Sequence, residues 1–110
     1  MTRLPMSSAG AALLRALLAR AGINRDRILL TDYRSTDWQS LIFIGERHEM
    51  RFRIPGPMAA EAYMAMIDGL ADSEISISRQ VLADIALFGK PTHECDGSIS
   101  FGIEALTIEE

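Results

Sequence analysis

Apolar residues recur with a helical period in two segments of the chain. The first stripe lies between a serine pair at residues 7 and 8, either of which can act as N-cap, and Gly22, which suits a left-handed C-terminal position. Its members are Leu13, Leu14, Leu17, Leu18 and Ala21. The second stripe follows Pro57 and consists of Ala59, Ala62, Tyr63, Met66, Ile67 and Leu70. These two patterns predict two amphipathic helices, each with one apolar face.

Short segments rich in β-branched and apolar residues predict the strands. They cover residues 27–33, 38–44, 48–54, 74–88 and 98–108. The polar stretch from Arg34 to Asp37 is typical of a turn, and the stretch from Gly89 to Gly97 is typical of a loop.

Gly45-Glu46 predicts a two-residue hairpin turn between the second and third strands. Glycine at the first central position is what a type II′ turn requires. With this register the inner face carries Leu41, Phe43, His48, Met50 and Phe52. A slip by one residue exchanges part of this set, so the register stays open.

Residues 79–88 fit two kinds of element. A helix would begin at Ser78 and end at Gly89, before Pro91. A strand is indicated by apolar alternation, broken only by Arg79, with polar residues on the opposite face. The length of the alternation favours the strand, with a kink near Ser78.

The resulting element order is α-β-β-β-α-β-β. This order predicts a single α+β domain over residues 1–110, in which an antiparallel sheet carries both helices on one face.

Composition and charge narrow the class of protein. An apolar fraction of 48% excludes a disordered chain, and no apolar run is long enough to span a bilayer. The first five residues lack the pattern of a signal peptide, and the one cysteine, Cys95, suits a reducing compartment. We therefore expect a soluble cytoplasmic protein without membrane contact.

The net charge of −4 is unevenly distributed along the chain. Nine basic and five acidic residues precede Ile54, whereas two basic and ten acidic residues follow it. The basic first half and the acidic second half of the chain are expected to attract each other, within one fold or between subunits.

Three stretches resemble a small group of uncharacterised alphaproteobacterial proteins. The first runs from Asp37-Trp38-Gln39-Ser40 through Phe43, Gly45, Arg47 and His48, and the others are 81–85 and 104–107. The resemblance spans most of the chain. It implies a compact bacterial protein without assigned activity, and it carries over no catalytic residue.

Two places in the sequence hold groups capable of chemistry. His93-Glu94-Cys95-Asp96 combines a base, acids and a nucleophile, and His48 is the only other histidine. A small enzyme or ligand-binding protein would need His48 to meet the loop with His93, Glu94 and Cys95. We predict no metal site, because a second cysteine is missing, and no cofactor, because no phosphate-binding glycine motif occurs. Solvated-loop and core positions for these residues are the preferred interpretation, so an enzyme is not expected.

The other hairpin face indicates association. It carries Trp38, Ile42 and Ile44 together with Arg51 and Arg53, a mixture that protein interfaces favour. Nucleic-acid binding is not expected, since the net charge opposes a polyanion. The sequence therefore predicts a non-enzymatic module that forms a homo-oligomer, most simply a dimer, or binds a protein partner.

Overall fold

The computed structural model describes residues 6–110, so the first five residues, on which the expectation about a signal peptide was based, lie outside it. Six main elements and two short 3-10 turns follow one another. They are α1 (Ser8–Arg20), η1 (Arg25–Arg27), β1 (Leu29–Gln39), β2 (Ile44–Ile54), α2 (Ala59–Ile67), η2 (Leu70–Asp72), β3 (Gln80–His93) and β4 (Ile99–Glu109).

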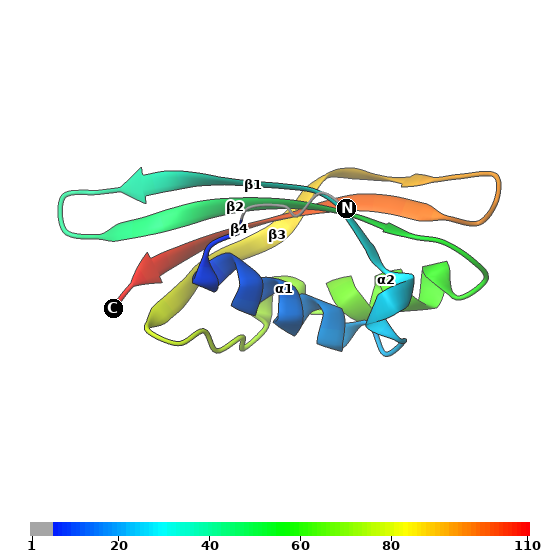
Figure 1. Cartoon of the computed structure of the whole chain (residues 1–110), viewed down its shortest axis with the longest axis horizontal. Helices are drawn as coiled ribbons and strands as arrows, with labels where there is room; N and C mark the ends of the chain where they lie inside the picture. Colours follow the sequence, from blue (N-terminus) through cyan, green and yellow to red (C-terminus); the bar gives the residue numbers. More distant parts are fainter. Residues whose placement is uncertain (1–5) are drawn as a thin grey trace.

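The four strands form one antiparallel sheet in the order β1-β2-β4-β3. Both helices lie on one face of this sheet, and the two hairpins extend beyond the helices at opposite ends (Figure 1). The predicted α+β class and the placement of the helices are therefore confirmed. Two long strands, rather than three, lie between the helices.

The predicted turn at Gly45-Glu46 is wrong, and so is the predicted turn from Arg34 to Asp37. β1 continues through residues 34–37, and the chain reverses at residues 40–43 instead. Gly45 lies inside β2, opposite Trp38 on β1 and Ile108 on β4. A Cβ atom there would lie 2.1 Å from the carbonyl oxygen of Thr107. Glycine at this position therefore allows two strands to approach each other and makes no turn.

The shifted turn divides the predicted inner face of the hairpin. His48, Met50 and Phe52 are buried beneath the helices, as predicted. Leu41 and Phe43 are not on that face, because they belong to the turn, and their exposed fractions are 102% and 47%.

Residues 80–88 are a strand, which decides between the two alternatives in favour of the predicted one. The predicted start of this strand at residue 74 is wrong, because residues 74–79 precede β3 and Arg79 takes a positive φ of 62° just before the strand begins. β3 then continues to His93, so the predicted loop from Gly89 to Gly97 is shorter than expected. The pairing of β3 with β4 is irregular between Leu82 and Asp84 and again between Phe88 and Thr92.

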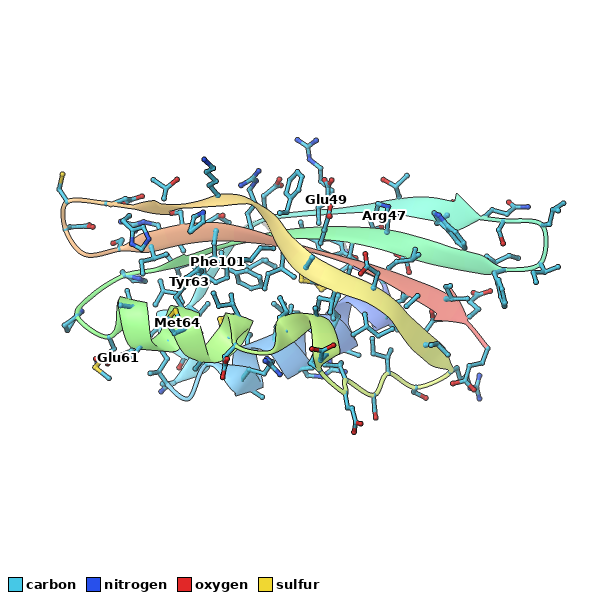
Figure 2. The ribbon with its side chains drawn as sticks, turned by 180° about the vertical axis from the view of Figure 1, so that it is seen from behind. Arg47, Glu49, Glu61, Tyr63, Met64 and Phe101 are labelled. Carbon is cyan, nitrogen blue, oxygen red and sulfur yellow. The ribbon has the colours of Figure 1, made fainter. Side chains whose placement is uncertain are left out.

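Both helices pack through their predicted stripes. The hydroxyl of Ser7 caps α1 by accepting a hydrogen bond from the Gly10 N–H at 3.1 Å. Leu13 and Leu17 of α1 and Met66 of α2 are buried against the sheet. Between α2 and the sheet, the ring of Tyr63 meets the ring of Phe101 edge to face, with 4.9 Å between the centroids (Figure 2).

Arg20 ties the last turn of α1 to the end of α2. Its guanidinium donates a hydrogen bond to the carbonyl of Met66 at 3.0 Å and another to the carbonyl of Asp68. These carbonyls lie where a helix leaves acceptors unpaired, so the cation satisfies them and complements the helix dipole.

Candidate functional site

His48 lies at the centre of a buried polar cluster on the inner face of the sheet. β2 places it between Ser35 of β1 and Ala105 of β4. Its Nδ1 atom lies 2.9 Å from the hydroxyl of Tyr33, and its Nε2 atom lies 2.9 Å from the hydroxyl of Thr107. A neutral imidazole donates from one nitrogen and accepts at the other, so one hydroxyl donates and the other accepts.

Solvent does not reach this histidine, whose exposed fraction is 0%. The hydroxyl of Tyr33 lies between His48 and α1. It fits there only because residue 10 is a glycine: a Cβ atom added to Gly10 would lie 2.3 Å from this hydroxyl oxygen. Burial lowers the pKa of His48 below its ordinary value, while the negative charge of Glu46 acts in the opposite direction. Burial also raises the pKa of Tyr33. His48 is thus a neutral, fully hydrogen-bonded core residue at neutral pH.

We expect the free energy of unfolding to fall as the pH drops below the ordinary histidine pKa, about 6.5. The unfolded chain binds a proton on His48 at a higher pH than the folded protein does, since the folded pKa is lowered. The stability is therefore complete above this pKa and decreases by up to about 1.4 kcal/mol per pH unit below it. Urea unfolding followed by circular dichroism between pH values of about 7.5 and 5.5 measures the effect.

The control for this prediction is His93→Gln. His93 is exposed, so its loss should leave the pH dependence intact, whereas His48→Leu should remove it. An equal loss of pH dependence in both variants would contradict the assignment to His48.

The second group of candidate residues lies at the turn between β3 and β4. Arg53 of β2 holds this turn through its guanidinium. Hydrogen bonds join it to Glu94 at 3.2 Å, to Asp96 at 3.3 Å and to Ser98 at 3.1 Å. Hydrogen bonds from Ser98 and the charge of Arg53 lower the pKa of Asp96. The ion pairs of Arg53 with Glu94 and Asp96 are one instance of the attraction expected between the basic and the acidic halves of the chain.

The remaining members of this turn are open to solvent. Cys95 is a free, exposed thiol, and His93 rests edge-on against the ring of Tyr63 with 6.5 Å between the centroids. Among residues 6–110, no group of three His, Cys, Asp or Glu side chains is placed to hold a metal ion.

The joint site of His48 with the 93–96 turn is not formed. On β4, His48 faces Ala105, whereas His93 faces Ile99. At roughly 3.3 Å per residue, these positions lie about 20 Å apart along the strand. Hydrogen-bond reach in a working site is about 3 Å, so these groups cannot share one reaction.

A third feature is the apolar end of the β1–β2 hairpin, residues 40–44, which we name the hairpin tip. Its apolar side chains have exposed fractions of 102% for Leu41, 80% for Ile42, 47% for Phe43 and 58% for Ile44. The tip projects beyond α1 at one end of the molecule (Figure 1). Such a run of exposed apolar residues is rare on the surface of a monomer.

The predicted interface residues separate into two groups. Ile42 and Ile44 belong to the hairpin tip, and the half-buried Trp38 lies opposite Gly45 just behind it. Arg51 is further along β2, where its guanidinium lies 5.1 Å from the centre of the Phe88 ring. Arg53 is engaged with the β3–β4 turn. The outer face of β2, with Arg47 and Glu49, points away from the helices (Figure 2).

Sequence reasoning missed the two partners of His48. Thr107 continues the inward-facing positions of Ile99, Phe101, Ile103 and Ala105, and a polar residue in such a stripe signals a buried hydrogen bond. For Tyr33 the corresponding signal is Gly10, because a glycine inside a helix marks a close approach by another group.

No helix within the described part of the chain is both long and apolar enough to cross a bilayer. No family model matches the sequence, and no curated protein matches it. Among solved structures, a chain from the virion of a native gene transfer agent particle has a similar fold, with a TM-score of 0.54 and 19% sequence identity. The similarity covers 74% of this chain and 67% of the other. At this identity, the chain shares a fold with a protein of that particle.

Proposed function

We propose that the chain is a non-enzymatic assembly subunit, which works by binding copies of itself or other protein subunits. The observation that carries the proposal is the hairpin tip, where four consecutive apolar side chains are exposed at the end of a long hairpin. Each large apolar side chain that leaves water contributes roughly 1.5–3 kcal/mol of transfer free energy. The tip therefore favours a protein contact over solvent.

Further observations support this role. His48 is enclosed and fully hydrogen-bonded, and it is far from the other candidate groups, so the arrangement favours binding over catalysis. The fold shared with a chain of a virion particle supports membership of a multi-subunit assembly. The free thiol of Cys95 supports assembly in a reducing compartment such as the cytoplasm. From the resemblance of three stretches of the sequence, we also propose that the chain is related to small uncharacterised alphaproteobacterial proteins.

Ile42→Glu is expected to weaken self-association at micromolar concentration while the monomer stays folded. A carboxylate at the tip would have to lose water on association, whereas in the monomer it stays solvated, since Ile42 is 80% exposed. Size-exclusion chromatography with light scattering measures the association, and circular dichroism confirms the fold.

Met64→Glu is the matched control. Met64 is an apolar side chain on α2 with an exposed fraction of 57%, away from the tip. The Met64→Glu substitution should leave self-association unchanged. A wild-type protein that stays monomeric and captures no partner subunit would overturn the proposed function, as would equal effects of the two substitutions.

A further inference from the structure

The two edges of the sheet are unequally protected against pairing with another strand. The edge strand β3 is irregular at two places, and the second contains Gly89, with a φ of 75°, followed by Lys90 and Pro91. Proline donates no backbone hydrogen bond, and irregular edges resist strand addition. The edge strand β1 contains no proline, and its pairing with β2 has one irregularity, between Leu30 and Asp32, followed by one continuous register from Asp32 to Gln39. β1 is thus the edge suited to accept a further strand.

The hydrogen bond from the Ser40 N–H to the Phe43 carbonyl fixes which backbone groups of β1 are free. Antiparallel pairs alternate between hydrogen-bonded and non-hydrogen-bonded residues. The backbones of Asp32 and Arg34 therefore point to β2, while those of Tyr33, Ser35 and Asp37 point to the open edge. An added antiparallel strand would find donors and acceptors on these three residues.

The charges on β1 select a second copy of the chain as this strand. Asp32 and Arg34 lie on the sheet face opposite the helices, with side-chain exposures of 48% and 75%, and their side chains approach to 3.6 Å. We propose that β1 pairs antiparallel with β1 of a second copy about a two-fold axis at Tyr33, so that Asp32 of each copy faces Arg34 of the other. This inference rests on the proposed function and specifies its partner and geometry.

Two other symmetric registers are less favourable. An axis at Arg34 would place the two Arg34 side chains opposite each other, and an axis at Asp37 would do the same for the two Asp37 side chains. Like charges directly opposite each other destabilise a sheet, whereas opposite charges stabilise it. The axis at Tyr33 gives two ion pairs in place of such repulsion.

The same register gives the hairpin tip a place to bind. Past the irregularity between Leu30 and Asp32, Asp37 of one copy would lie near Leu29 of the other, so the tip would continue along residues 23–28. Leu29 is 46% exposed. Next to this segment is a groove of about 260 Å³, lined by Leu18, Ala19, Gly22, Ile23 and Arg15. One two-fold contact thus covers the open edge and places an apolar tip beside a groove lined by Leu18 and Ile23, twice in each dimer.

Charge exchange between the copies tests the register. Arg34→Glu should weaken self-association by about tenfold, because each Asp32 then faces a carboxylate, and Asp32→Lys should do the same with two cations. An equimolar mixture of the two variants should regain association as a heterodimer, since each residue again faces an opposite charge. Light scattering gives the association and native mass spectrometry the composition of the dimer. Ion pairing within one chain cannot produce this rescue, because mixing the two variants does not change the residues that either chain carries.

Lys90→Glu on the opposite edge is the matched control and should leave association unchanged. A mixture that associates as weakly as its components, or single variants that associate like the wild type, would overturn the inference. If Ile42→Glu prevents association and the charge variants do not, the edge pairing fails and the proposed function stands. If the mixture is rescued while Ile42→Glu has no effect, the edge pairing stands and the role of the tip fails.

Discussion

Phe52→Ala is expected to lower the free energy of unfolding by about 3–5 kcal/mol, the range for a large aromatic residue truncated in a core. The exposed fraction of Phe52 is 1%, and its ring stacks on Phe101 with 5.4 Å between the centroids. β2 is paired on both sides, so its backbone cannot collapse into the space left by the missing ring. The remaining cavity therefore adds to the lost transfer free energy.

Equilibrium unfolding in urea, followed by the fluorescence of Trp38 at submicromolar concentration, measures this loss. Phe43→Ala removes the same ring from the hairpin tip, where it is 47% exposed, and should cost less than about 0.5 kcal/mol. A small effect for Phe52→Ala would contradict its position in the core. A domain has a total stability of only about 5–15 kcal/mol, so the larger loss brings the variant close to unfolding.

His48→Leu is expected to cost about 2–4 kcal/mol, although leucine is apolar and similar in size. The substitution removes the imidazole partner of two buried hydroxyls, those of Tyr33, which is 7% exposed, and of Thr107, which is 0% exposed. An unpaired buried hydroxyl costs about 1–3 kcal/mol. The destabilisation therefore comes from the groups that remain, and thermal and urea unfolding of the variant measure it.

A triple variant separates this cause from poor packing. Tyr33→Phe and Thr107→Val, added to His48→Leu, remove both hydroxyls, and the stability should return in part because no polar group is then left unpaired. A triple variant less stable than His48→Leu alone would show that packing dominates.

Elements whose pattern arises from one buried face could be predicted from the sequence. Leu13 and Leu17 on α1 and the inward positions of β4 follow from periodicity, because burial on a single side imposes the period. β1 could not be predicted to its full length, because it is an edge strand with seven exposed residues among its eleven. Arg34 to Asp37 therefore carries no apolar alternation and resembles a turn.

The error at Gly45 has a different physical origin. A glycine beside a polar residue favours a turn on local grounds, but here the close carbonyl of Thr107 comes from a strand far along the chain. The candidate site shows the same contrast between what the local sequence indicates and what the pairing of distant strands determines. The inward direction of His48 follows from its parity with Met50 and Phe52, whereas its hydrogen-bond partners and its distance from the 93–96 turn depend on strand order.

The position of β4 between β2 and β3 determines how the chain reaches its fold. Each half of the chain supplies a helix and a hairpin, and both hairpins consist of strands that are neighbours in sequence. The halves join through β2 and β4, whose pairs extend from Ile54 with Ile99 to Gly45 with Ile108. Closing these long loops costs entropy before any contact compensates for it. We therefore expect the hairpins to form early and their docking to limit the folding rate, as is usual for sheets with long-range pairing.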